Sequence, residues 1–394
     1  MNTVKRALNK AKRLLTPYLT FGKNGKFKAS VSSLPLADGK DVLVVFETSF
    51  GWDGIMRQRP QQTAMSFDDN VTVFYHSSKD NYPDKTRCRK VADGVYVLNL
   101  DLYRKYLFEA AKKEYKDLKK ILIVYSTDPV SISLIEKYEA AGFTVIYEYV
   151  DDLDPALSAA RVYKKLLKKH EYMTSRKVKT VCTATRLYES VKDLTPAELI
   201  TNGCDYEHFK SREGIKRPDE MERFAGKKVI GYYGAVAEWM DYDLLRRISD
   251  SGEYEIVLLG ISYDGSFEAS GLAENDHIHF LGKKSYDELP SYAAFFDVCV
   301  IPFRKCDLTE STSPVKLFEY MAAEKPIVTT DLAECRKYKS VFCAKSHDEF
   351  LEKLKEAYDS RDNEEYRALL RQEAAVNTWE SKCSQIIRFA LDKE

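Results

Sequence analysis

Short runs of apolar residues alternate with charged stretches along most of this chain of 394 residues. Runs of four to six apolar residues are typical of strands buried on both faces, and the longer charged intervals suit helices. In the first half, the strands are predicted at 41–46, 71–75, 95–98, 121–125, 145–149 and 180–183, with helices in intervals such as 104–120 and 130–141. This alternation predicts an α/β domain of the Rossmann type.

The same pattern begins again after residue 226. Strands are predicted there at 228–233, 255–259, 277–281, 298–302, 327–330 and 341–343. The segment 212–226 is charged and contains Pro218, with glycines near both of its ends, which suits a linker. Because the chain is longer than a single hydrophobic core usually supports, we expect two domains.

The segment that follows the predicted strand 298–302 has the features of a binding site. Ser313 is a suitable N-cap, Pro314 suits the first helical position, and no helix breaker occurs from Lys316 to Met321. A helix start attracts anions, and Lys316 adds a full charge there. Glu319 lies one turn further on the same face, so both side chains can contact one ligand. The alternative interpretation is a solvated ion pair on an ordinary amphipathic helix.

Three segments carry a resemblance to a known family. The sequence SPVKLFEYMAAEKPIV, at 313–328, is similar to the donor-binding motif of GT-B glycosyltransferases, and in particular of the family-four-like bacterial enzymes of cell-surface polysaccharide synthesis. TNGCDYEHF at 201–209 and YDELPSYAAFFDVCVIPF at 286–303 also resemble segments of that family. Two positions depart from its pattern. Glu324 stands where the family usually has glycine, and Ser311 stands where it often has a first glutamate, with Glu310 one position out of step.

The resemblance implies the GT-B fold, in which two Rossmann-like domains face a cleft and a C-terminal helix crosses back to the first domain. It divides the chain into an N-terminal segment (1–28), an acceptor domain (29–210), a donor-nucleotide domain (211–376) and the crossing helix (377–394). It also implies a donor site for a nucleotide-diphosphate sugar, in which Lys316 holds the diphosphate and Glu319 holds sugar hydroxyls. The residues expected to bind the donor are Gly234, Ala235, Arg304, Ser311, Ser313, Pro314, Val315, Lys316 and Glu319.

Loops that follow predicted strands contribute the other candidates, because ligands bind at the carboxyl ends of strands in open α/β sheets. The loop 47–64 resembles an RPQ-containing loop of some bacterial GT-B enzymes. In it, Asp53 is a candidate base for an acceptor hydroxyl, and Arg57 and Arg59 are candidates for binding a phosphate of the acceptor or donor. Asp151 and Asp152 end another strand and are candidates for catalysis or acceptor recognition. The alternatives are helix caps and surface arginines, and Asp154 before Pro155 is best interpreted as such a cap.

Charge and composition add a prediction about location. Lysine and arginine together number 61, as do aspartate and glutamate, yet the first 28 residues hold eight Lys or Arg and no acid. Apolar residues recur there at helical spacing, which predicts an interfacial helix on an anionic membrane surface. A second basic stretch at 161–179 could extend that surface, or could be a solvated helix. A packed or disordered N-terminal arm and nucleic-acid binding are the alternatives for the first 28 residues.

The remaining composition excludes several classes. No apolar run approaches the length of a transmembrane span, and no secretory signal is visible. The eight cysteines form no CxxC pair and no histidine cluster completes a metal site, so we expect reduced thiols, no metal and no cofactor.

The sequence therefore predicts a metal-independent, hexosyltransferase-like glycosyltransferase. We expect it to move a sugar from a nucleotide-diphosphate donor, a UDP-sugar, to a lipid-linked or oligosaccharide acceptor. Its expected location is peripheral, at the cytoplasmic face of the cell membrane, with no nucleic-acid partner. Two alternatives remain open at this point: a noncatalytic protein that binds a sugar nucleotide or glycan on the same fold, and a nucleotide-sugar epimerase.

Overall fold

The computed structural model describes residues 34–35, 39–54, 57–77, 88–153, 160–210 and 214–392. The predicted amphipathic segment 1–28 and Asp154 lie outside these ranges. No helix within them is both long enough and apolar enough to cross a membrane.

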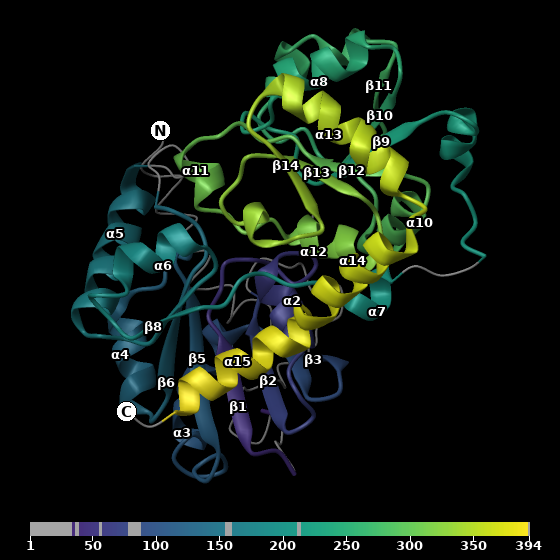
Figure 1. Cartoon of the computed structure of the whole chain (residues 1–394). Coiled ribbons are helices and arrows are strands. Elements are labelled where there is room, and N and C mark those ends of the chain that lie inside the picture. The colour runs from purple at the N-terminus through teal and green to yellow at the C-terminus, as the bar shows by residue number, and fades with distance from the viewer. Residues whose placement is uncertain are drawn as a thin grey trace, which may run out of the picture.

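The described chain forms two α/β domains, each built on its own sheet (Figure 1). The first sheet has eight strands in the order β3-β4-β2-β1-β5-β6-β7-β8, all parallel except β3, which runs antiparallel to β4. Its strands are β1 (Val42–Phe46), β2 (Val71–His76), β3 (Cys88–Ala92), β4 (Val95–Leu98), β5 (Lys119–Tyr125), β6 (Thr144–Tyr149), β7 (Thr180–Cys182) and β8 (Ala197–Leu199). Its helices are α2 (Arg59–Met65), α3 (Leu100–Ala110), α4 (Ile132–Ala140), α5 (Ala160–Ser175) and α6 (Thr185–Val191).

The second sheet has six parallel strands in the order β11-β10-β9-β12-β13-β14. These strands are β9 (Val229–Tyr233), β10 (Glu255–Leu259), β11 (Ile278–Phe280), β12 (Val298–Ile301), β13 (Ile327–Thr330) and β14 (Val341–Ala344). The helices around it are α7 (Tyr206–Phe209), α8 (Tyr242–Asp250), α9 (Ser266–Ala269), α10 (Leu289–Ala293), α11 (Asp307–Glu310), α12 (Val315–Ala322), α13 (His347–Ser360) and α14 (Glu364–Val376). Short 3-10 helices are η3 (Asp219–Phe224), η4 (Leu272–Glu274), η5 (Tyr286–Glu288) and η6 (Cys335–Lys337). This strand order is that of a doubly wound sheet: from β9 the strands are added first on one side (β10, β11) and then on the other (β12, β13, β14), so the switch point lies between β9 and β12.

The predicted apolar runs form strands that are buried on both faces, as expected. Every residue of β1, β9, β10 and β12 is buried, because helices cover both faces of a parallel sheet. One hydrophobic core surrounds the second sheet, and two cores lie on the opposite faces of the first.

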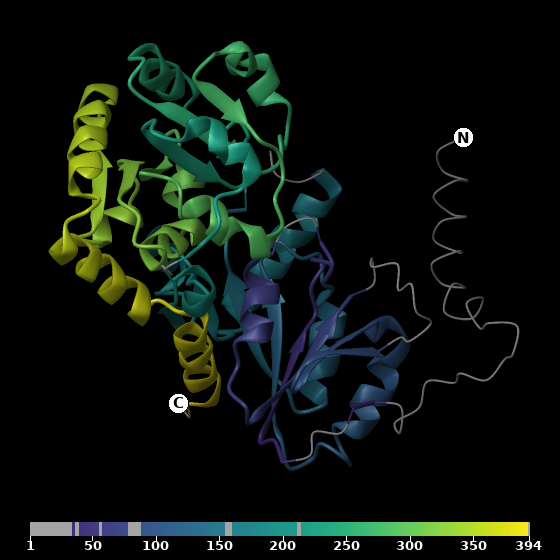
Figure 2. The same cartoon turned by 90° about the vertical axis from the view of Figure 1, so that its right-hand side faces the viewer.

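The C-terminal helix returns to the first sheet, as predicted. α14 ends at Val376, Asn377 breaks the helical path, and α15 (Trp379–Leu391) follows (Figure 2). Ile386 and Phe389 of α15 belong to a core of the first sheet, and the thiol of Cys383 donates to the carbonyl of Thr63 at 3.3 Å. Apolar burial, joined by this contact, holds the crossing helix on the first domain.

One predicted helix was misplaced, and two short strands were missed. The helix expected at 104–120 begins earlier, at Leu100, because the Asn99 side chain caps it by accepting from the Asp101 N–H at 3.1 Å. It ends at Ala110, and Lys119 and Lys120 belong instead to β5, where they pair with β1. The short strands β3 and β8 were not predicted, because each is charged and only partly buried.

Candidate active site

A cavity of about 770 Å³ opens between the two domains. The second domain lines it with the loops that follow β9, β10 and β12 and with the start of α12, and the first domain lines it with the ends of β5 and β6 and the segment before α2. These are carboxyl ends of parallel strands, and β9 and β12 flank the switch point of the second sheet. The cavity therefore lies where open α/β sheets bind their ligands.

The helix that was predicted to carry the site begins one residue later than expected. Pro314 is the N-cap of α12 and Val315 is the first helical residue, so Lys316 is the second. Ser313 does not cap the helix. Its hydroxyl accepts the Asn202 N–H at 3.2 Å and its carbonyl accepts from Asn202 Nδ2 at 2.6 Å, so Ser313 instead joins the second domain to the first-domain segment after β8. The orphan N–H groups of α12 consequently face the cavity without a capping side chain.

Lys316 and Glu319 both line the cavity, one helical turn apart. Burial lowers the pKa of Lys316 to about 8, against an opposing effect of Glu319, and burial raises the pKa of Glu319 to about 7, with Lys316 acting in the opposite sense. The ammonium nitrogen of Lys316 lies 5.2 Å from the ring centroids of both Tyr232 and Phe303. A buried ammonium attracts a diphosphate strongly, because little water screens the charge.

Gly234 fits beneath the Lys316 side chain. Its φ is 142°, and a Cβ there would lie 2.9 Å from Lys316 Cε. A larger residue would therefore push the ammonium away. Ala235 follows it on the cavity wall, and its carbonyl accepts from the Tyr232 hydroxyl at 2.8 Å.

Trp239 and Asp241, in the same loop, have different roles. The Asp241 side chain caps α8 by accepting the Leu244 N–H at 2.9 Å. Trp239 lines the cavity and packs near Tyr263, with ring centroids 5.9 Å apart. The glycosyl donor candidates in this loop are thus Gly234 and Ala235, with Trp239 beside them.

Two predicted donor residues do not line the cavity. The Arg304 side chain is exposed outside it, while its backbone N–H donates to the Trp239 carbonyl at 2.8 Å. Ser311 is fully buried and does not line the cavity, and Glu310 Oε1 is also buried. The wall at this point is made by Leu308, Thr309 and Thr312.

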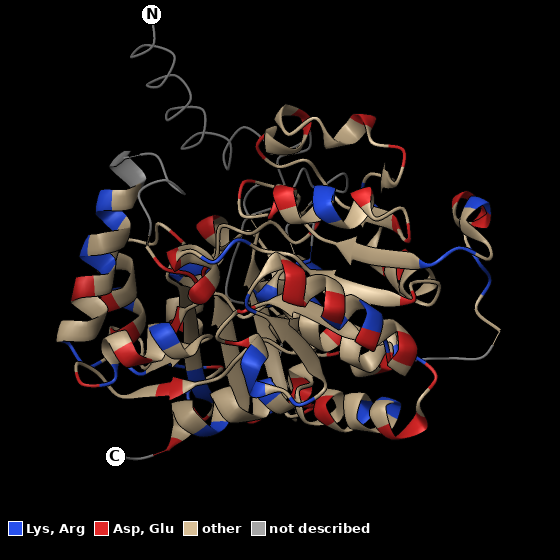
Figure 3. Ribbon diagram, turned by 45° about the horizontal axis from the view of Figure 1, so that its top comes forward, with Lys and Arg blue, Asp and Glu red and all other residues tan. Residues whose placement is uncertain are grey.

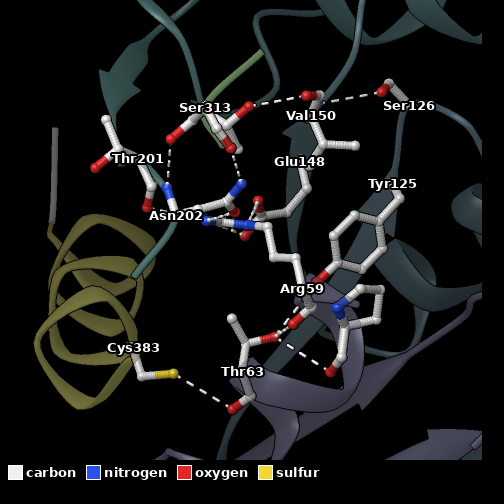
Figure 4. Close-up of polar contacts among 12 residues, drawn as sticks. Arg59, Thr63, Tyr125, Ser126, Glu148, Val150, Thr201, Asn202, Ser313 and Cys383 are labelled. Atoms are coloured by element: carbon white, nitrogen blue, oxygen red, sulfur yellow. Dashed lines mark hydrogen bonds and ion pairs between the residues drawn. The ribbon is translucent and has the colours of Figure 1, made fainter. Parts of the chain in front are cut away.

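Arg59 reaches the cavity but its guanidinium is committed within the protein (Figure 4). Nε donates to Glu148 at 2.8 Å, and Nη1 donates to the Thr201 carbonyl at 3.1 Å and to Asn202 Oδ1 at 3.2 Å. Both charges of the pair are buried. Arg59 thus holds α2, β6 and the segment after β8 together, and through Asn202 it supports Ser313. That it also binds a phosphate stays a prediction.

Of the two other candidates in that loop, Arg57 lines the cavity and Asp53 does not. Asp53 is 55% exposed, pairs with Arg89 at 2.8 Å and does not line the cavity, so the structure places this candidate base away from the site. Arg57 does line the cavity, with its guanidinium carbon 4.9 Å from the ring centroid of Tyr286. It remains a candidate for binding a phosphate or acceptor.

Asp151 and Asp152 line the first-domain wall at the end of β6. Asp152 Oδ1 accepts the Leu153 N–H at 2.8 Å, which orients that carboxylate toward its own loop. Burial, with a smaller effect of Asp152, raises the pKa of Asp151 to about 7. A carboxylate that titrates near neutral pH suits a general base, so Asp151 is the better placed of the two.

Among the cavity residues that the sequence analysis did not single out are Lys283, Tyr286 and Thr127. Lys283 follows β11, and the rule that ligands bind after strands would have found it. Tyr286 begins a segment that was noticed only for its resemblance, and Thr127 follows β5 with a buried hydroxyl oxygen that makes no hydrogen bond to a described group.

The helix α5 of the first domain contributes one side of the cavity wall. On α5, Tyr163 and Leu166 line the cavity, whereas Lys164, Lys165 and Lys168 are exposed. Lys169, predicted as part of a basic surface, is buried instead and donates to the carbonyl of Tyr125 at 2.6 Å and to that of Asp128. Within the described part of the chain, no three His, Cys, Asp or Glu side chains are grouped as metal ligands.

Residues 227–360 match the family model described as "Glycosyl transferases group 1". A curated relative from Bacillus subtilis, TuaH, is named for an assigned role as a teichuronic acid biosynthesis glycosyltransferase. It is 22% identical over 241 residues, which cover 57% of this chain and 60% of the relative. The match thus spans less than two thirds of that protein.

Solved structures of similar shape cover nearly the whole chain. Sucrose-phosphate synthase of Thermosynechococcus elongatus matches with a TM-score of 0.62 at 12% identity, over 89% of this chain and 98% of that one. HepE of Anabaena, solved with UDP-glucose, matches with a TM-score of 0.58 at 12% identity, over 88% and 98%. WaaG, a glycosyltransferase of lipopolysaccharide biosynthesis, matches with a TM-score of 0.54 at 13% identity, over 89% and 100%. At these identities the likeness establishes the fold.

Proposed function

The chain has the GT-B fold and resembles the bacterial glycosyltransferases of that fold, and from this we propose that it transfers a sugar from a nucleotide-diphosphate donor to a glycan acceptor. The observation that carries the proposal is the pair Lys316 and Glu319, one turn apart at the uncapped start of α12 in the interdomain cavity. The helix amides and Lys316 suit a diphosphate, and Glu319 suits sugar hydroxyls.

In this proposal, positive charge in the site stabilises the departing diphosphate. Breaking the bond between sugar and diphosphate leaves negative charge on the leaving group, which the Lys316 ammonium and the α12 amides are placed to stabilise. On the facing wall, Asp151 would accept the proton of the acceptor hydroxyl. We propose a UDP-sugar as donor, because HepE has a similar fold and was solved with UDP-glucose. The proposed reaction needs no metal.

The test is a screen of UDP-, GDP- and dTDP-sugars for thermal stabilisation of the full chain. A ligand that binds the native state raises its apparent stability, by about 2.7 kcal/mol when its concentration is a hundred times Kd. We expect one nucleotide class to stabilise the protein and Lys316→Ala to abolish that shift. Absence of any shift with all three classes would contradict the proposal.

A second candidate function is noncatalytic binding of a sugar nucleotide or glycan. It is favoured by the placement of Asp53 and Ser311, neither of which lines the cavity. Release of nucleoside diphosphate from the bound donor, in the presence of glycan acceptors, separates the two functions, since only an enzyme turns the donor over.

We further propose that the acceptor is lipid-linked and that the protein works at an anionic membrane surface, on the cytoplasmic side. The support is the basic segment 1–28 and the outer face of α5, where Lys164, Lys165 and Lys168 are exposed near Leu167, which is 40% exposed. The lysine and arginine positions of the ribbon are blue in Figure 3. Lysines beside an exposed leucine favour binding to anionic lipid, at about 1 kcal/mol for each cation near the surface. The cavity lies on the opposite face of the same helix.

Vesicle sedimentation tests this location. Deleting residues 1–28 and replacing Lys164, Lys165 and Lys168 with glutamate should each reduce binding to vesicles of phosphatidylglycerol, with little effect on soluble nucleotide binding. Salt should weaken the binding of the parent protein, because it screens the charges. Equal vesicle binding by the parent and both variants at low salt would contradict the proposal.

A further inference from the structure

A second cavity, of about 490 Å³, lies on the second domain away from the interdomain cleft. The residues before β9, β12 and β13 line it, so it opens at the amino ends of these strands, whereas the candidate active site opens at their carboxyl ends. Strands of four or five residues place these two edges about 15 Å apart. The second cavity is therefore separate from the donor site.

Five cations line this cavity: Arg217, Lys227, Lys325, Arg361 and Arg367. Three of them have acidic partners, since Lys227 pairs with Glu255 at 2.7 Å, Arg367 with Glu324 at 2.9 Å and Arg361 with Asp362 at 3.5 Å. The other two, Arg217 and Lys325, make no ion pair with a carboxylate among the described residues.

The two unpaired cations are held in place by other contacts. The Arg217 guanidinium carbon lies 4.4 Å from the ring centroid of Phe295, which fixes the plane of the group and leaves its N–H fork free. Lys325 Nζ donates to the Ala294 carbonyl at 2.6 Å, and its other two N–H donors have no acceptor within the described chain. Burial lowers the pKa of Lys325. An ammonium placed there gains from an anion more than an exposed one would.

A strained residue forms part of the same wall. Glu324 has φ 54°, a left-handed conformation that usually belongs to glycine, and it lines the cavity beside Lys325. Its carboxylate binds Arg367 at 2.9 Å and Arg371 at 2.6 Å, so it occupies two cations of α14 and leaves Lys325 without that partner. Backbone strain of this kind persists where the surrounding structure fixes it, and it gathers at ligand sites.

We propose that this cavity binds a small phosphate ester, with Arg217 and Lys325 as its main contacts. The guanidinium fork of Arg217 matches two phosphate oxygens and the Lys325 ammonium meets the third, which satisfies a dianion with the two cations that lack acidic partners. The volume exceeds that of phosphate alone and leaves room for an organic group of sugar size, within the usual range of ligand cavities. Arg361, stacked 3.9 Å from the Tyr358 ring centroid, borders that room.

A ligand in this cavity would contact both segments that connect the two domains. Arg217 belongs to the chain that connects the two domains, and Arg361 lies in the turn between α13 and α14, which leads to the crossing helix. Both covalent routes between the domains thus pass the cavity. A bound phosphate ester would tie them to Lys325, on the turn after α12.

Calorimetry on the full chain tests the proposal, in a Lys316→Ala background that removes the diphosphate contact of the donor site. Inorganic phosphate and glucose 1-phosphate are the two probes. We expect saturable binding of glucose 1-phosphate with a stoichiometry near one, and at least tenfold weaker binding in Arg217→Ala and in Lys325→Met. Arg217→Ala alters a half-buried side chain before η3, so it keeps the test valid if Lys325→Met fails to fold.

The control is Lys305→Ala, which removes an exposed cation of the same domain that pairs with Asp331 at 2.8 Å, outside this cavity. It should leave binding unchanged. Equal affinity for both probes would identify phosphate itself as the ligand, and tighter binding of glucose 1-phosphate would identify a phosphorylated metabolite. No binding of either probe, or binding that Arg217→Ala does not weaken, would overturn the proposal.

Discussion

At the scale of single residues, Lys316 carries most of the expected function. Its ammonium sits at the start of α12, above Gly234 and beside two aromatic rings. We expect Lys316→Ala to lower kcat/KM for sugar transfer by roughly a hundredfold, since the loss of one preorganised group that stabilises developing charge has about that effect. Steady-state release of nucleoside diphosphate measures it.

The matched control is Lys305→Ala, because that lysine is exposed, belongs to the same domain and lies outside the candidate active site. It should keep kcat/KM within about twofold, as surface substitutions usually do. Comparable losses in the two variants would remove Lys316 from the site.

Asp151 and Asp53 make a second comparison at this scale. The pKa of Asp151 is about 7, raised first by burial, and a base acts in its ionised form, so the ionised fraction and kcat should rise with pH up to about 7. Below that value, kcat at saturating donor should fall by about tenfold per pH unit. Saturating donor matters because Glu319 also has a pKa raised to about 7.

Asp151→Asn should lower kcat by a hundredfold or more and remove that acidic limb, as expected for a lost general base. Asp53→Asn should change neither, because Asp53 pairs with Arg89 outside the cavity. An acidic limb that survives in Asp151→Asn would assign the base elsewhere.

These residues also mark what the sequence could predict. Lys316 and Glu319 were found because helical spacing is local: three positions along the chain fix their shared face. The roles of Arg59 and Asp53 were missed because their partners, Glu148 and Arg89, lie 89 and 36 positions away and meet them only after folding. No local sequence pattern distinguishes an arginine that hydrogen-bonds within the protein from one that is free to bind a phosphate.

At the scale of elements, the end of α12 has a glutamate, Glu324, where the local preference is for glycine, and contacts with α14 account for it. Glu324 takes the left-handed conformation that follows a helix, and its carboxylate binds Arg367 and Arg371 of α14. We expect Glu324→Ala to be less stable than Glu324→Gly by about 1 kcal/mol, because both lose the arginine contacts and only alanine keeps the backbone strain. Urea unfolding of the two variants gives the difference directly.

The comparison with the parent separates the two effects. If Glu324→Gly unfolds at a lower urea concentration than the parent, the contacts with α14 outweigh the strain. Equal stability of the alanine and glycine variants would contradict the strain at this position, since any loss of arginine contacts is common to both.

Elements were predicted well where burial alone decides them. The runs that became β1, β9, β10 and β12 are apolar throughout, so periodicity located them within a residue or so. The edge strand β3 is partly exposed and charged, and its pairing with β4 is set by the sheet already present. The start of α12 moved by one residue because Asn202, from the other domain, takes the hydroxyl of Ser313 that would have capped it.

At the scale of the whole molecule, the two domains are joined by polar contacts besides α15. Ala184, at the N-cap of α6, has no capping group of its own, and Glu334 of the second domain accepts the Thr185 N–H at 2.7 Å in its place. Lys337 binds both Glu334 and the Thr185 hydroxyl at 2.5 Å. Asn202 and Ser313 form a separate contact between the domains. Glu334 thus both caps α6 and joins the two domains.

We therefore predict that Glu334→Ala loosens the closed arrangement. Loss of a cap costs about 1 kcal/mol, which corresponds to roughly a fivefold shift in the ratio of open to closed forms. Hydrogen exchange read by NMR should show faster exchange at Thr185, and also about fivefold faster exchange at Asn202, which does not touch Glu334 but donates its N–H across the same interface. Asp348→Ala, which breaks an exposed pair with Arg247 inside the second domain, should leave both amides unchanged. Faster exchange at Thr185 with unchanged protection at Asn202 would mean that Glu334 caps α6 without controlling closure.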